Sequence, residues 1–166
     1  MRIRVLPRRV DPPFDLREIV DWLGIELVYS RLPPSVRGFY LRSGTIAAIL
    51  INSSDSGVVA RWTLAHELAH HLNDLTSDAA AAAAMLTDTH DDRWETACEH
   101  LAAELLMPEA AIRRLIGAPK PGIPAFRNIE IRDFAYLFEV SSSAMRHRLQ
   151  AMGYHIAGDA GRKRRL

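Results

Sequence analysis

A single helical pattern constrains this chain more than any other feature, because it places three ionisable side chains next to one another on a largely apolar helix. Residues 66–70 read His-Glu-Leu-Ala-His. Histidines four residues apart lie on one face of a helix, one turn apart. A buried helix needs partners for two imidazoles and a carboxylate, and a metal ion is such a partner. The flanking residues make this helix apolar over much of its circumference: Val58, Val59, Trp62, Leu64, Ala65, Leu68, Ala69 and Leu72.

The spacing of His66 and His70 allows two neutral imidazoles to hold one Zn²⁺ ion. Glu67 follows the first histidine and projects from the same end of the site. It can reach a water molecule at the metal without binding the metal itself, which is the position of a general base. The alternative is an amphipathic helix whose histidines are ordinary hydrogen-bonding groups. The apolar flanks favour the metal site.

A catalytic zinc ion needs a third protein ligand and an open fourth position. Residues 92–107 predict a second helix, in which Glu95 and Glu99 lie one turn apart near the start. Spacing alone leaves the third ligand open between these two glutamates, with His100 as a further candidate. Both acids also suit the solvated first turns of a helix. The apolar stripe of this helix consists of Trp94, Cys98, Leu101, Ala102, Leu105 and Leu106.

Two blocks of sequence resemble a known family of enzymes. Residues 63–70 read Thr-Leu-Ala-His-Glu-Leu-Ala-His, and residues 95–108 read Glu-Thr-Ala-Cys-Glu-His-Leu-Ala-Ala-Glu-Leu-Leu-Met-Pro. Both are similar to the motifs of the ImmA/IrrE family of zinc metallopeptidases, and weaker similarity extends over about residues 14–156. The resemblance implies that Glu95 is the third zinc ligand, beside His66 and His70. Glu99 stands where the family usually has Asn or Asp.

The remaining chain predicts an α+β fold, in which a small, mostly antiparallel sheet packs on a zincin-like bundle of zinc-binding helices. A helix is expected from Asp11 through Leu23, with Gly24 as its stop. Residues 25–29, 38–42 and 45–52 predict strands, and the last two form a hairpin. The alanine-rich segment before residue 93 is expected to be a mobile helix or a partly ordered loop. Its far end could hold a second metal cluster, although solvated residues are the simpler interpretation: Asp88, His90, Asp91 and Asp92.

Two further helices are expected near the C-terminus, with Ser141 capping the second. They form a helical hairpin that resembles a helix-turn-helix, or simply a pair that covers the core. The predicted domains are a metallopeptidase core over residues 1–117, this hairpin over 118–156, and a basic flexible tail over 157–166. His147, Tyr154 and His155 come from this region and are candidates for a second donor to the substrate's oxyanion.

Composition limits the function classes. Apolar residues make up 48% of the 166 residues and charged residues 25%, as in ordinary folded domains. A net charge of +1 gives no global attraction to nucleic acid. The N-terminus lacks the apolar stretch of a signal peptide, and no apolar run is long enough to span a bilayer. These features indicate a cytoplasmic protein without a membrane partner. The single cysteine, Cys98, is expected to be core filler.

The sequence therefore predicts a peptidase that uses one Zn²⁺ ion per chain, with Glu67 as its base. The resemblance implies a protein substrate, often a helix-turn-helix repressor. The alternative is a DNA-binding transcriptional regulator with a structural or sensory metal site.

Overall fold

The computed structural model describes residues 11–76, 92–120, 124–126 and 128–157. Within these ranges the chain forms six helices, a three-stranded sheet and a two-stranded sheet, which is a mixed α+β fold. It divides into two compact units, one over residues 15–105 and the other mainly over the residues that follow. The predicted domain boundaries remain predictions. The alanine-rich run, the cluster at Asp88, His90 and Asp91, and the basic tail lie outside the described residues.

The first unit begins with helix α1 (Leu16–Leu23), followed by strands β1 (Glu26–Ser30), β2 (Gly38–Ser43) and β3 (Ile46–Asn52). Asp15 caps α1 through its side chain, so the helix begins later than the prediction at Asp11. Gly24 ends the helix in the left-handed conformation, as predicted, because glycine adopts it without steric cost.

The three strands form a mixed sheet in the order β1-β3-β2. β2 and β3 form the predicted antiparallel hairpin, in which Tyr40 lies opposite Ile49. β1 pairs with β3 in parallel, so the expectation of a mostly antiparallel sheet was wrong. The connection over residues 31–37 carries the chain past β3 to the far edge, and β3 then returns between the two other strands. The alternation of apolar residues in β1 fixes its faces but not its direction relative to its neighbour.

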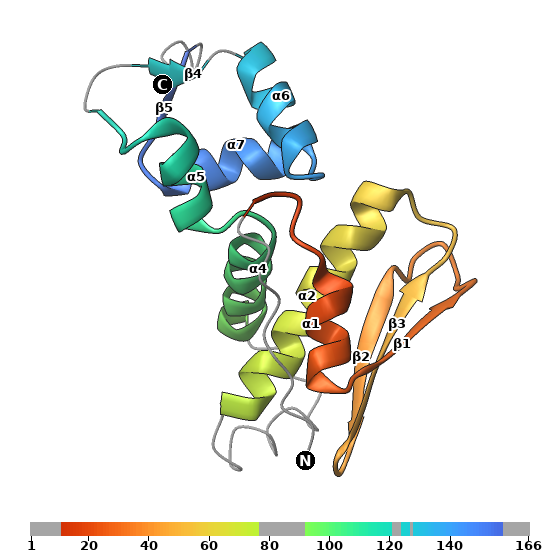
Figure 1. Cartoon of the computed structure of the whole chain (residues 1–166). Coiled ribbons are helices and arrows are strands. Elements are labelled where there is room, and N and C mark those ends of the chain that lie inside the picture. The colour runs from red at the N-terminus through yellow and green to blue at the C-terminus, as the bar shows by residue number, and fades with distance from the viewer. Residues whose placement is uncertain (1–10, 77–91, 121–123, 127, 158–166) are drawn as a thin grey trace. The chain divides into compact units, whose positions relative to one another are not determined.

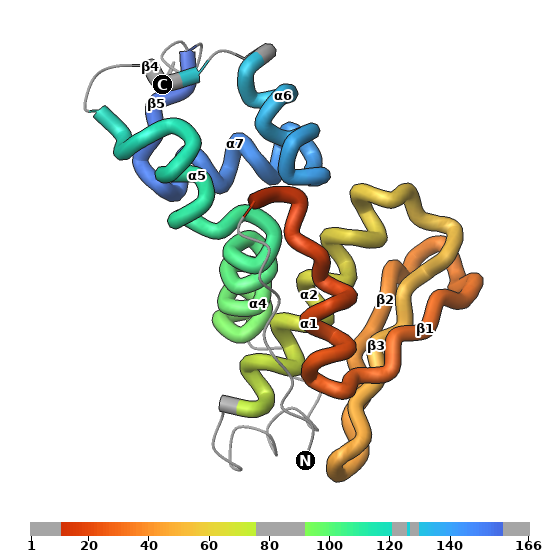
Figure 2. The backbone as a smooth tube through the Cα atoms, in the orientation of Figure 1, coloured from red at the N-terminus to blue at the C-terminus, as the bar shows by residue number. Residues whose placement is uncertain are grey.

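The long helix α2 (Gly57–Thr76) is the centre of the first unit and packs along β2 and β3. Figures 1 and 2 show α1 and α2 on the same side of the sheet. Helix α4 (Asp92–Leu106) follows the undescribed segment. The core of this unit is formed by buried side chains from α1, β3, α2 and α4: Leu16, Val20, Ile49, Ile51, Leu64, Ala65, Leu68, Ala69, Cys98 and Ala102.

The second unit contains α5 (Glu109–Ile116), β4 (Pro124–Phe126), α6 (Asn128–Leu137), α7 (Ser142–Ala151) and β5 (His155–Ile156). The Ser141 side chain caps α7, as predicted. β4 and β5 pair in parallel. The two helices α6 and α7 pack on each other around a small apolar core, to which Ile131, Phe138, Met145 and Leu149 contribute. None of the described helices is long and apolar enough to cross a membrane.

Candidate metal centre

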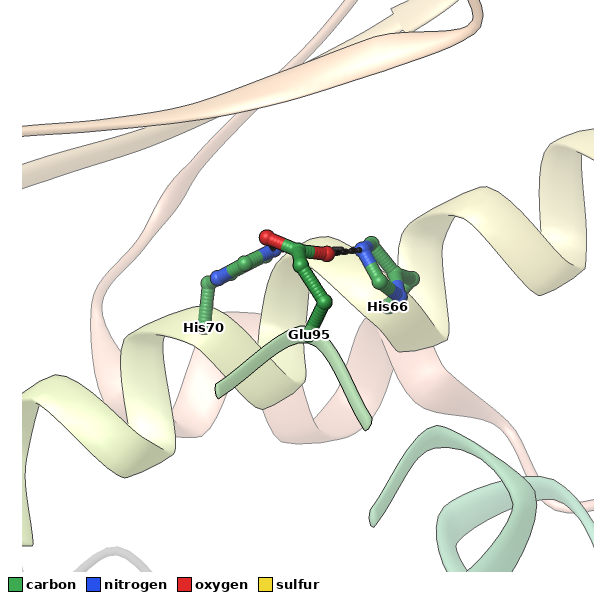
Figure 3. Close-up of side chains that lie close together, drawn as sticks. All are labelled: His66, His70 and Glu95. Atoms are coloured by element: carbon green, nitrogen blue, oxygen red, sulfur yellow. Dashed lines mark hydrogen bonds and ion pairs between the residues drawn. The ribbon is translucent and has the colours of Figure 1, made fainter. Parts of the chain in front are cut away.

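Two adjacent helices of the first unit bring three ligand-type side chains together. His66 and His70 project from α2, and Glu95 projects from the first turns of α4 (Figure 3). The two Nε2 atoms of the histidines are 3.1 Å apart. One carboxylate oxygen of Glu95 lies 3.3 Å from Nε2 of His66, and the other lies 3.7 Å from Nε2 of His70.

These distances fit a shared metal ion. Ligand atoms placed about 2.0–2.1 Å from a tetrahedral zinc ion are separated from one another by about 3.3 Å. The three groups also share a chemical property, because imidazole nitrogens and carboxylate oxygens can all donate electron pairs to one cation. Among the described residues, they are the single group of three such side chains close enough to hold one ion.

The centre is open to solvent on one side. The side chains of His66, His70 and Glu95 are 22%, 19% and 35% exposed, so a fourth ligand can approach from outside. The rival candidates for the third ligand, Glu99 and His100, are exposed on α4 and do not belong to the cluster. Of the three candidates that sequence spacing left open, Glu95 is the one that the fold places beside the two histidines, and its role as a ligand remains a prediction.

Glu67 lies on α2 between the two histidines in sequence and is 8% exposed. Its carboxylate accepts a hydrogen bond from the backbone N–H of Tyr40 in β2. The pKa of Glu67 is raised to about 7: burial is the main cause, the hydrogen bond from Tyr40 opposes the shift, and the negative charge of Glu95 adds to it. A carboxylate with a pKa near neutrality can both take up and release a proton at physiological pH.

The imidazole of His70 has two further neighbours at Nδ1. The indole N–H of Trp94 donates to it over 3.3 Å, and Sγ of Cys98 lies 3.4 Å away. Trp94 suits the tautomer of His70 with no hydrogen on Nδ1, whereas the sulfur of Cys98 can accept a hydrogen from Nδ1 in the other tautomer. When Nε2 binds a metal ion, Nδ1 carries the hydrogen, and of these two groups only the sulfur can accept it. Cys98 is buried, as predicted, but it also contacts a candidate ligand, which its place on an apolar stripe did not indicate.

A second polar cluster lies on the neighbouring face of α2. The Tyr40 hydroxyl donates to Oδ2 of Asp74 over 3.1 Å and lies 3.0 Å from Nδ1 of His71. Arg42 binds the same carboxylate oxygen of Asp74 over 2.6 Å. Burial, then the charge of Asp74, raises the pKa of Tyr40 to about 12. Sequence reasoning missed this cluster, although a polar run at 71, 73 and 74 in an apolar helix was a signal for it.

The candidates for a second oxyanion donor lie in the second unit. The Tyr154 hydroxyl donates to the carbonyl of Gly117 within that unit, and Tyr154 is buried. His147 and His155 are exposed.

Comparison with known proteins identifies the family. The family model described as the IrrE N-terminal-like domain, Peptidase_M78, matches residues 20–150. The chain belongs to this family. The resemblance inferred from the two motifs is therefore confirmed, and membership implies a peptidase. A search of curated proteins found no match.

One solved structure is also similar to this member of the IrrE-like family. It is a transcriptional regulator of Mycobacterium tuberculosis, with 16% sequence identity and a TM-score of 0.54. The match covers 81% of this chain and 38% of that protein, so the chain spans well under half the length of the regulator. At this identity the likeness concerns the fold alone.

Proposed function

We propose that this chain is a zinc-dependent peptidase that hydrolyses peptide bonds in a protein substrate. The observation that carries the proposal is the convergence of His66, His70 and Glu95 beside a buried glutamate whose pKa is raised to about 7. Membership of the Peptidase_M78 family supports the same reaction class.

In the proposed mechanism, His66, His70 and Glu95 hold the metal ion, in a zincin-like arrangement. A bound Zn²⁺ ion supplies acidity to a water molecule and polarises the carbonyl group of the scissile peptide. Glu67 takes the proton from the attacking water and then passes it to the nitrogen of the leaving amine. The hydrogen bond from Tyr40 occupies part of the Glu67 carboxylate and leaves the remaining lone pairs for the proton transfer.

The proposed substrate is a helix-turn-helix repressor, as the family resemblance implies. The exposed side of the metal centre supports a macromolecular substrate, because a peptide segment must reach the ligands from solvent. The neighbour in the fold comparison is described as a transcriptional regulator, which is consistent with a role in transcription.

The decisive variant is Glu67→Gln, which is nearly isosteric and removes the proton acceptor. Zinc content should stay at one equivalent per chain, whereas hydrolysis should fall by at least about 10²–10⁴-fold. The measurement is cleavage of purified repressors encoded beside the gene, followed by mass spectrometry. Glu99→Gln is the matched control, because Glu99 is exposed on α4 and lies outside the cluster. Near wild-type cleavage by the Glu67 variant would refute the mechanism.

DNA binding is the weaker candidate for this chain. Of the basic residues on α7, Arg148 is half-buried and donates from Nε to the carbonyl of Met107 over 3.0 Å, which commits part of its guanidinium to the interior of the second unit. A regulator without peptidase activity would bind duplex DNA with an affinity that falls steeply as salt rises.

A further inference from the structure

The polar cluster beside the metal centre has a regular arrangement along α2. Glu67, His71 and Asp74 are spaced by four and three residues, so they lie on one stripe of the helix. This stripe faces β2, because Tyr40 contacts all three side chains and Arg42 binds Asp74. The candidate ligands His66 and His70 lie on the adjoining stripe.

The strand β2 follows the same stripe closely. A Cβ atom added to Gly38 would lie 2.6 Å from the carbonyl oxygen of Leu50 and 2.6 Å from Cγ2 of Thr63. The absence of a side chain at this position therefore lets the strand approach the helix. Thr63 lies one turn before Glu67 on α2, so Gly38, Tyr40 and Arg42 meet successive turns of the helix in order.

The geometry of the sheet explains why Tyr40 can contact Glu67 through its backbone and His71 through its side chain. β2 is an edge strand, with β3 on one side. The carbonyl of Arg37 accepts a hydrogen bond from Asn52, so the odd-numbered backbone groups face β3 and the even-numbered ones point away from it. The N–H of Tyr40 is thereby free to bond with Glu67, while its ring packs edge-on against His71, with 5.4 Å between ring centres.

The number of hydrogens available determines which group donates in the hydrogen bonds of the Tyr40 hydroxyl with Asp74 and His71. The carboxylate of Asp74 can only accept, so the Tyr40 hydroxyl donates its single hydrogen to it. His71 must then donate from Nδ1 to the Tyr40 oxygen. Every polar atom of this contact has a matched partner, which makes the placement of the tyrosine ring specific.

We propose that Tyr40 is a positioning residue for Glu67, and that its hydroxyl, held by Asp74 and His71, keeps its own backbone N–H on the Glu67 carboxylate. Tyr40 thus connects Asp74 to the orientation of the Glu67 carboxylate, two helical turns away. The catalytic part of this inference rests on the proposed peptidase function.

The first test needs no substrate. Amide hydrogen exchange, followed by NMR on the zinc-loaded full chain, reports whether the N–H at position 40 stays bonded. Tyr40→Phe keeps the ring and removes the hydroxyl, so exchange at position 40 should become about tenfold faster, while amides of the β2–β3 hydrogen bonds keep their protection. Tyr29→Phe is the control, because Tyr29 lies on β1 at the opposite edge of the sheet. Unchanged exchange at position 40 would overturn the proposal.

The second test measures catalysis with an internally quenched peptide that the wild-type chain cleaves, selected from a random library. Tyr40→Phe should lower kcat about tenfold because the base is misplaced. KM should change by less than about twofold, since substrate binding is retained. Zinc content should match that of the wild type. An active Tyr40→Phe variant with unchanged kcat would overturn the positioning role.

The two tests separate the failure of this inference from the failure of the proposed function. If the zinc-loaded wild-type chain cleaves no peptide, the peptidase proposal and the catalytic role of Tyr40 both fail, and the exchange measurement alone decides whether the hydroxyl holds the N–H on Glu67. If Tyr40→Phe does not fold, Asp74→Asn weakens the same hydroxyl contact and is subjected to both measurements, with the same outcomes confirming or refuting the proposal.

Discussion

The two polar stripes of α2 differ in how their hydrogen-bonding groups are satisfied. On the stripe facing β2, each donor meets an acceptor: Tyr40 binds Asp74, Arg42 binds Asp74, and the N–H of Tyr40 binds Glu67. On the adjoining stripe, the two Nε2 atoms of His66 and His70 face each other and a carboxylate. On the stripe facing β2, these donors are matched by acceptors within the protein. On the adjoining stripe, electron-pair donors surround a point that suits a cation. A polar cluster can therefore be assigned to support or to ligand binding by its balance of donors and acceptors.

Substitution of the histidines on the two stripes should give the largest difference, which is a difference in zinc content. His66→Gln and His70→Gln should each abolish stoichiometric zinc, because two protein ligands hold the ion far more weakly than three. The His71→Gln variant should keep one equivalent of zinc, since His71 lies on the other stripe, where it contacts Tyr40 of β2. Metal analysis after dialysis is the measurement. A full equivalent of zinc in the His66 or His70 variant would show that the ligand set is wrong.

Glu95 and Glu99 of α4 extend the same comparison to a second helix. Glu95→Gln should lower zinc affinity by more than about 100-fold, because it removes a direct ligand and its charge. Glu99→Gln should change affinity by less than about threefold, because an exposed charge is screened by solvent. Competition with a chromophoric chelator measures both. The reverse order of effects would indicate that Glu99, one helical turn further along α4, is the ligand in place of Glu95.

Stability as a function of pH tests the burial of Glu67, which lies on the stripe facing β2. The pKa of this carboxyl is raised from 4.5 to about 7 in the folded chain, first by burial. The folded state therefore binds the proton more tightly, and its extra stability is complete below about pH 4.5 and is lost as the pH rises through about 7. The loss is at most about 3 kcal/mol. Urea denaturation of the metal-free chain should show this decline, and Glu67→Gln should remove it; an equal decline in both proteins would contradict the assignment.

The smallest effect concerns the close approach of β2 to α2. Gly38→Ala places a methyl group against the backbone oxygen of Leu50, which cannot move easily, and should destabilise the chain by about 1–3 kcal/mol. Gly57→Ala is the control, because its added Cβ would meet no atom within 4 Å. Thermal unfolding compares the two. A Gly38 variant as stable as the control would indicate that the strand can withdraw from the helix.

The sequence alone determined the local features of this protein. The helix with His66 and His70, the hairpin of β2 and β3, and the cap at Ser141 follow from spacings and turn residues that act over a few positions. The motifs also sufficed to identify the family, because they combine ligand-type residues with fixed apolar neighbours. The roles of His66, Glu67, His70 and Glu95 remain predictions, although the structure brings the three ligand candidates together.

Only the tertiary structure decided which long-range partners these elements find. Spacing could not choose between Glu95 and Glu99, because one turn of α4 separates them and the choice depends on how α4 lies against α2. The parallel pairing of β1 and the contacts of Tyr40 with α2 were equally hidden, since both depend on which residues face each other across elements distant in sequence. Local patterns record which face of an element is buried, whereas contacts between faces arise from packing, and packing depends on the whole chain at once.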